Sequence, residues 1–279
     1  MNPSSGVNIQ KVKAFWEANP LWTGESKYTP GTKEFFEEHR KIVLEDCFAG
    51  KLDERAIPKN LGKKRVLDLG CGLGFWSIEL FLRGCKNIVA VDLTESSLSL
   101  TKKRCSNYGV KAKLSVQNAE ELGLDDETFS HVNCHGVIHH TPETDACIKE
   151  IHRVLEKNGT ACISVYFLNI FLRLWPLINF FGKIITFFGA GLRGRGRERI
   201  YEVRDCDELV RLYDGIDNPI GKYYTMDEFK TMLEPYFKIE EVYLHYFPAR
   251  TLPFKLPKSV HRFLDRHSGF LVYANLKKR

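Results

Sequence analysis

Three glycines separate an apolar strand-like run from an apolar helix-like run in the segment Arg65–Trp76, whose sequence is RVLDLGCGLGFW. Gly70, Gly72 and Gly74 allow the backbone to turn sharply and allow a ligand to approach without meeting a Cβ atom. The start of the next helix offers free N–H groups to an anion. Asp92 ends the next strand, where a carboxylate can accept hydrogen bonds from ribose hydroxyls. The arrangement predicts an α/β sheet that binds a nucleotide-like ligand.

From residue 64 onward, short apolar runs alternate with helical stretches. Such alternation is typical of right-handed crossovers and of a parallel sheet with helices on both faces. The expected strands are 65–69, 87–92, 112–117, 131–135 and 160–166, and the expected helices are 75–83, 96–108 and 144–155. Two final strands are expected at 237–246 and 269–276, with a short basic helix between them at 258–266.

Changes in this pattern divide the chain into four parts. We expect a helical N-terminal cap, a ligand-binding core, an insert that forms a lid or acceptor site, and final strands that complete the sheet, at residues 1–60, 61–166, 167–235 and 236–279 respectively. The cap carries aromatic residues, including Trp22 and Tyr28, that either close over a ligand or pack on the sheet edge. The insert opens with an apolar stretch, 167–192, whose longest uncharged run falls short of the ~20 residues that span a bilayer.

Charge and cysteine usage restrict the class of protein. Lys and Arg number 41 and Asp and Glu number 35, which gives a net charge of +6. This excess favours an anionic substrate or surface but does not demand nucleic acid. The 8 cysteines include no Cys-x-x-Cys pair, so zinc-ribbon spacing is absent and no metal is expected. Since the polar segment 1–10 has no apolar signal core, we interpret the cysteines as reduced thiols of a cytoplasmic protein.

The glycine loop does not fit a nicotinamide or flavin dehydrogenase. The fingerprint of those enzymes is Gly-x-Gly-x-x-Gly. This chain has Phe75 in place of the third glycine if the motif starts at Gly70, and Ser77 if it starts at Gly72. The strand also carries Asp68, whose negative charge would oppose a pyrophosphate. An acid at this place suits a ligand with an ammonium and a sulfonium, which is S-adenosylmethionine (SAM).

With these features the chain resembles the class I SAM-dependent methyltransferases over residues 64–166, and more loosely over 237–276. Residues 117–120 lie where the family commonly has an Asp-Ala-Glu-like triplet near the adenine. Residues 135–142 look like the Val-Leu-His-His segment of the small-molecule subgroup that includes quinone-biosynthesis and arsenite methyltransferases, and 154–159 are similar to the family's Leu-x-Pro-Gly-Gly turn. The resemblance implies a Rossmann-like, seven-stranded, mostly parallel sheet with one antiparallel strand.

The resemblance also implies SAM as cofactor and S-adenosylhomocysteine (SAH) as product. The cofactor-binding residues expected from the motifs are Asp68, Gly70, Cys71, Gly72, Gly74, Phe75, Trp76, Asp92, Leu93, Asn118, Ala119, Glu120, Cys134 and His135. The alternative is that the glycines and Asp92 only shape a doubly wound sheet.

Methyl transfer is an in-line displacement, which needs a base only if the acceptor must lose a proton. We expect His139 or His140 to be that base, against the alternative that they tie the fourth loop to backbone or cofactor. Acceptor-binding residues are expected in the cap and near the end of the fifth strand and the insert. These candidates are Trp22, Tyr28, Tyr166, Asp214 and Asn218, although the segment around Asp214 and Asn218 also reads as a turn cluster.

The sequence favours a small-molecule or lipid-like acceptor over nucleic acid, because residues 134–137 replace the Asn/Asp-Pro-Pro-aromatic segment of amino-purine DNA methyltransferases. One interpretation of 167–200 is a peripheral membrane contact, with its arginines facing anionic lipid; another is a helical pair packed on the sheet. These arginines are Arg193, Arg195, Arg197 and Arg199. An alternative function is that of a SAM-binding, catalytically silent, membrane-associated partner protein.

Overall fold

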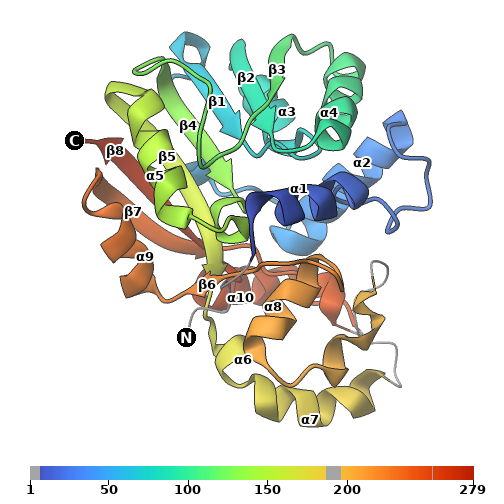
Figure 1. The fold of residues 1–279 in the computed structure, drawn as a ribbon. Coiled ribbons are helices and arrows are strands. Elements are labelled where there is room, and N and C mark those ends of the chain that lie inside the picture. The colour runs from blue at the N-terminus through green and yellow to red at the C-terminus, as the bar shows by residue number, and fades with distance from the viewer. Residues whose placement is uncertain (1–6, 187–195, 253) are drawn as a thin grey trace.

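The computed structural model describes residues 7–186, 196–252 and 254–279. Its centre is one sheet with the strand order β3-β2-β1-β4-β5-β8-β7, and a short strand, β6, pairs with β5 (Figure 1). All neighbouring pairs are parallel except those that involve β8, which is antiparallel to both β5 and β7. The strands are β1 Arg65–Leu69, β2 Asn87–Asp92, β3 Ala112–Val116, β4 Phe129–His135, β5 Leu155–Phe167, β6 Tyr223–Tyr224, β7 Phe237–His245 and β8 Leu271–Lys278. The predicted mostly parallel sheet with one antiparallel strand is confirmed, with β6 added beside the carboxyl end of β5.

Helices cover both faces of this sheet. The helices are α1 Ile9–Ala18, α2 Lys33–Ile42, α3 Phe75–Leu82, α4 Glu95–Asn107, α5 Thr144–Val154, α6 Ile170–Arg173, α7 Trp175–Thr186, α8 Cys206–Asp214, α9 Met226–Leu233 and α10 Lys258–Ser268. Shorter helical turns are Val43–Cys47, Glu54–Ala56, Leu61–Lys63, Ile138–His140, Arg197–Glu202 and Ala249–Thr251. Helices α5 and α9 pack on one face of the sheet, and α3 and α4 pack on the other.

Strand β5 begins earlier than the sequence predicts. The motif at residues 154–159 predicts a turn before a strand at 160, whereas the strand starts at Leu155. Leu155 pairs with Phe129 ahead of a register shift, and His131 then pairs with Thr160. The predicted turn residues therefore belong to β5, in the part of the strand where its pairing with β4 is irregular. Asn158 has a left-handed φ of +63° there.

The N-terminal cap is fastened to the core by a buried cation. Arg104 of α4 has no exposed surface, and its guanidinium donates to the carbonyl of Leu73 in the glycine loop at 3.3 Å and to the carbonyl of Phe36 in α2 at 3.5 Å. Burial lowers the pKa of Arg104 to about 10. The side chain thus joins cap, loop and α4 in one contact.

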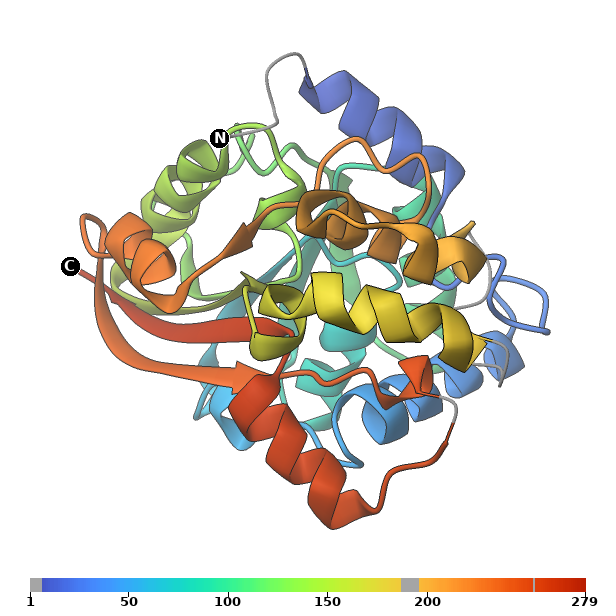
Figure 2. The same ribbon diagram turned by 90° about the horizontal axis from the view of Figure 1, so that it is seen from below.

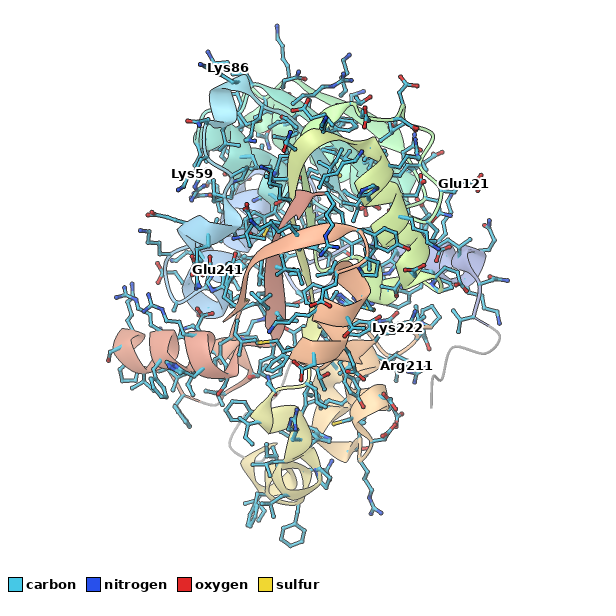
Figure 3. The ribbon with its side chains drawn as sticks, turned by 90° about the vertical axis from the view of Figure 1, so that its left-hand side faces the viewer. Lys59, Lys86, Glu121, Arg211, Lys222 and Glu241 are labelled. Atoms are coloured by element: carbon cyan, nitrogen blue, oxygen red, sulfur yellow. The ribbon has the colours of Figure 1, made fainter. Side chains whose placement is uncertain are left out.

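The insert lies beyond the carboxyl ends of the parallel strands. Figure 3 shows Lys86, which comes just before β2, at one end of the molecule and the insert helices at the opposite end. Figure 2 looks onto that end, with α7 across the middle and α10 beside it. The carboxyl ends of β1, β2, β4 and β5 therefore face a space enclosed by the cap and the insert, which is where ligands bind in open α/β sheets.

Candidate functional site

A first cavity opens at the carboxyl ends of β1, β2 and β4 and is covered by α1. Its lining comes from the cap, the glycine loop and the loops after β2, β3 and β4. These residues are Ile9, Val12, Trp16, Leu21, Leu69, Gly70, Gly72, Asp92, Leu93, Ser97, Gln117, Asn118, Ala119, Gly136, Val137, His140 and Thr141. The cavity therefore contains the predicted residues from the glycine loop, the end of β2 and the loop after β3.

The glycine loop presents bare backbone to this cavity. Gly70 has φ +71°, and its N–H donates to the carbonyl of Val91 at 2.8 Å. A Cβ atom on Gly70 would lie 2.3 Å from a methyl carbon of Val137, a distance that no side chain can accommodate. Glycine is therefore required at this position both by the backbone conformation and by the approach of the β4 loop.

Asp92 lies at the rim of the same cavity with its orientation fixed. One carboxylate oxygen accepts from the Gly72 N–H at 2.9 Å, and the other accepts from the Thr94 N–H at 3.0 Å and the Thr94 hydroxyl at 2.8 Å. Burial raises the pKa of Asp92, while these donors favour its charged form. Thr94 is the N-cap residue of α4, but its hydroxyl bonds Asp92 and not the helix N-terminus.

Asp68 lies beneath the loop and lines neither this cavity nor the next. Its carboxylate accepts from the Ser77 hydroxyl at 2.5 Å and from the Asn133 amide at 2.8 Å. Burial raises its pKa from 3.8 to about 6. In this structure Asp68 positions the loop and the start of α3, and direct contact with an ammonium group stays a prediction.

A second cavity continues from the first toward the insert. The two share Trp16, Leu21, Gly70, Gly136 and His140. The second also takes predicted residues from every part of the chain: Trp22, Cys71, Phe75, Trp76, His135, Tyr166 and Asp214. The shared wall means that two ligands, one in each cavity, would meet beside the loop after β4.

Three polar side chains form a connected group in the second cavity. The Tyr166 hydroxyl donates to Asp214 at 2.9 Å, and His140 Nε2 lies 3.3 Å from the same carboxylate oxygen. His140 Nδ1 lies 2.9 Å from the carbonyl of Ile220. Since a carbonyl can only accept, Nδ1 carries the proton and Nε2 faces the carboxylate. The arrangement can exchange a proton between an acceptor, the imidazole and Asp214.

His139 differs from its neighbour. His139 is fully buried, and the centre of its ring lies 4.2 Å from the ring centres of both His140 and Tyr166. Neither ring nitrogen has a hydrogen-bond partner within the described chain, and burial lowers its pKa well below the usual value. Of the two predicted bases, His140 has the polar partners that proton transfer requires, and His139 lines neither cavity.

Several other predicted residues also lie away from both cavities. Cys134 is part of the buried core, and Tyr28 is exposed. Glu120 accepts from the Glu143 N–H at 2.7 Å. The Asn218 amide donates to the carbonyl of Arg211, and its oxygen accepts from the Ile220 N–H, which matches the turn interpretation. Gly74 gives α3 its left-handed N-cap at φ +71°.

The site also contains residues that the sequence analysis did not select. Trp16 and Leu21 line both cavities, and Glu25, Arg197 and Arg250 line the second. Trp16 carried a local signal as an aromatic residue in an apolar helix. The charged residues carried none, because the pairing partners are separated by up to 225 positions in the chain.

The cavities fit SAM in two respects. Gly70 and Gly72 line the first cavity with backbone alone, and the two ring nitrogens of His135 at the second cavity lack partners among the described residues. Within the described ranges, no group of three or more His, Cys, Asp or Glu side chains is placed to hold a metal ion. Within the same ranges, no helix has the length and apolarity needed to cross a membrane.

Comparisons with known proteins agree with this geometry. Residues 67–163 match the family model of a methyltransferase domain. Over 166 residues the chain is 31% identical to the ubiquinone biosynthesis O-methyltransferase of Hahella chejuensis. This alignment covers 59% of this chain and 64% of that enzyme. The corresponding enzyme of Pseudomonas syringae is 32% identical over 114 residues, or 40% of this chain and 47% of that enzyme. The chain thus spans about half to two thirds of the length of these curated relatives.

Solved structures share the fold at low identity. A SAM-dependent methyltransferase from Mesorhizobium loti aligns with a TM-score of 0.53 and 18% identity, over 80% of this chain and 94% of that one. A protein from Pyrococcus horikoshii aligns with a TM-score of 0.55 and 18% identity, over 96% of this chain and 99% of that one. Residues 67–163 therefore match a methyltransferase domain in sequence, on a fold that is shared with a SAM-dependent methyltransferase.

Proposed function

We propose that this protein transfers the methyl group of SAM to a small, amphiphilic acceptor and releases SAH. The observation that carries the proposal is the shared wall of the two cavities, at which the loop after β4 brings His140 within reach of both. SAM supplies an electrophilic methyl group on a sulfonium. The protein's contribution is to align the acceptor with that group, because alignment alone removes much of the barrier.

The residues of the first cavity would hold the cofactor. The backbone at Gly70 and Gly72 would lie against its amino-acid end, and Asp92 would accept hydrogen bonds from the ribose. The loop after β3, at Asn118 and Ala119, would border the adenine, because an amide can pair with the edge of that base.

The residues of the second cavity would hold and activate the acceptor. His140 takes the acceptor's proton at Nε2, and Asp214 stabilises the charge that results. The Tyr166 hydroxyl fixes the carboxylate by donating to it. An acceptor that must be deprotonated, such as a hydroxyl, suits this group of side chains.

An apolar third cavity supports a lipid-like acceptor. It is bounded by Tyr166 and Tyr213, which also line the second cavity. The rest of its lining is nearly all apolar, comprising Phe171, Leu172, Trp175, Ile200, Tyr201, Leu209, Val210, Pro248, Thr251 and Phe270. A reactive head group in the second cavity could therefore extend a hydrocarbon tail into the third.

The exposed face of the insert supports a peripheral membrane contact. Of the four arginines first considered, Arg197 is only 2% exposed and pairs with Glu25, so its expected role of facing lipid is wrong. Arg193, Arg195 and the side chain of Arg199 lie outside what the structure describes. The support comes instead from apolar side chains of α7 that are more than half exposed, such as Leu177 and Phe180.

Methyl release tests the proposed function. The protein is incubated with methyl-labelled SAM and a lipid-containing cell extract, and SAH and labelled products are measured. We expect SAH release that depends on the extract and falls at least about a hundredfold in Asp214→Asn, since proton transfer contributes about that much. Binding of SAM with no SAH release from any extract would favour the silent partner protein, and no binding of SAM would reject both.

A further inference from the structure

A buried charged group forms part of the wall of the second cavity. Glu25, from the cap, places one carboxylate oxygen 2.7 Å from Arg197 Nη2 and 3.0 Å from Arg250 Nη1. The side chains of Arg197 and Glu25 are only 3% and 8% exposed, and that of Arg250 is 21% exposed. Cap, insert and the segment after β7 therefore meet at a desolvated ionic contact.

One donor in this contact has no acceptor. The two guanidinium groups share one carboxylate oxygen of Glu25. The Nε–H of Arg250 is buried and has no acceptor within the described residues. The other carboxylate of the cavity, Asp214, bonds Tyr166 and His140 instead. A buried donor without an acceptor is costly, so the Arg250 guanidinium is available to an acceptor from a ligand.

The surroundings restrict what that ligand can be. The Arg250 guanidinium lies 5.1 Å from the centre of the Trp22 ring. A planar guanidinium matches the two oxygens of a carboxylate. Aromatic residues of the same cavity, Trp22, Tyr213 and Tyr246, would surround the rest of the molecule.

We propose that Arg250, assisted by Arg197, binds a carboxylate of the methyl acceptor, with Glu25 occupying the site until the acceptor arrives. This inference rests on the proposed function and specifies its substrate class: an apolar or aromatic acid whose methylated atom lies toward His140. The carboxylate of SAM is the other possible source of this chemistry. The acceptor is favoured because neither arginine lines the first cavity and Arg197 belongs to the insert.

Calorimetry on the full chain with saturating SAH tests this site. The probes are three matched pairs of acid and neutral amide: benzoate and benzamide, 4-hydroxybenzoate and 4-hydroxybenzamide, octanoate and octanamide. We expect at least one acid to bind about tenfold more tightly than its amide. Arg250→Gln should remove that preference, and Arg250→Lys should keep part of it. Glu25→Gln should strengthen binding of the acid several-fold, because the competing carboxylate is gone, and should leave the amide unchanged.

Controls separate this inference from the proposed function. Arg204→Gln changes an exposed arginine and should alter no affinity, and thermal unfolding checks that each variant folds. Equal binding of acid and amide in all pairs, or binding of no probe while SAH binds normally, overturns the carboxylate site and leaves methyl transfer standing. Loss of SAH affinity in Arg250→Gln, with acid binding unchanged, assigns the arginine to the cofactor and also overturns it.

Discussion

At the scale of single residues, Asp92 is the clearest candidate for binding the cofactor. Its carboxylate is oriented by Gly72 and Thr94 and lies at the cavity rim. Asp92→Ala removes charge-assisted hydrogen bonds of about 1.5–3 kcal/mol, so SAH affinity should fall about ten- to a hundredfold, as measured by calorimetry. Thr94→Ala keeps the Asp92 carboxylate and removes one of its hydrogen-bond donors, so SAH affinity should fall much less in this variant. An unchanged affinity in Asp92→Ala would contradict the role.

Asp68 gives a prediction about stability and pH. Its pKa in the folded chain is about 6, above the ordinary 3.8, so its contribution to stability is fully present below about pH 4 and is lost as the pH rises through 6. A shift of this size corresponds to about 3 kcal/mol. Asp68→Asn, which cannot ionise, should therefore exceed the wild type in unfolding free energy at pH 7.5 by up to that amount.

The same comparison at pH 4 should give nearly equal stabilities, since both side chains are then largely neutral. Urea unfolding at the two pH values measures the difference, and Asp125→Asn, at an exposed position, serves as the matched control. A stability difference that is the same at pH 4 and pH 7.5 would show that the ionisation of Asp68 is not its source.

The predicted residues that line the first cavity are those whose position is set by local geometry. Gly70 and Asp92 follow directly from a strand end and a turn, so spacing alone placed them at the first cavity. Asp68 and His139 are also polar residues at or near strand ends. Their side chains point into the interior instead, because side chains alternate along β1 and because the turn after β4 is short. Which way such a side chain points depends on the elements packed against it, and these are distant in sequence.

At the scale of elements, α1 is fastened over the first cavity by an acid that caps another helix. The Glu17 carboxylate accepts from the N–H groups of Glu95 and Ser96 at 3.0 and 2.9 Å. Thr94, the residue at the N-cap, uses its hydroxyl on Asp92 instead. Glu17→Ala removes a cap worth about 1 kcal/mol, so α1 should cover the cavity less and SAH affinity should fall about fivefold.

Limited proteolysis together with SAH titration measures this effect. Cleavage within α1 should become faster in Glu17→Ala, and bound SAH should slow it again. Glu34→Ala, at an exposed position of α2, should alter neither quantity. Unchanged cleavage and unchanged affinity in Glu17→Ala would mean that the other contacts of α1 suffice to hold it.

Helix ends show which elements the sequence can predict. The capping box of α9 can be recognised in the sequence because Thr225 and Glu228 are three positions apart. Both of its hydrogen bonds form in the structure. The cap of α4 was not visible, because Glu17 is 78 positions from Glu95. The regular core follows from local periodicity in the same way, whereas the site between cap and insert is built from distant segments.

At the scale of the whole molecule, one end of the protein carries an apolar surface. Figure 2 looks onto this end, where α7 and α10 both lie toward the viewer. Leu177, Phe180 and Ile184 of α7 are 58%, 70% and 59% exposed, and Phe263 of α10 is 60% exposed. Basic residues of α10 accompany them, as Arg262 and Arg266 are also exposed. Apolar and basic side chains on one face favour the surface of an anionic membrane.

The third cavity lies beside this surface, so an acceptor could leave the lipid and enter through the insert. Vesicle binding tests the surface. Co-sedimentation with vesicles of anionic phospholipid at low salt should recover the protein, and neutral vesicles should recover less. Phe180→Asp should weaken binding about tenfold, since burying a phenylalanine contributes about 1.5–3 kcal/mol. Leu82→Asp makes the same change at a position of α3 that is 51% exposed, and should have no effect. If both variants bind as the wild type does, the apolar face of α7 does not contact lipid, and the acceptor must reach the second cavity from solution.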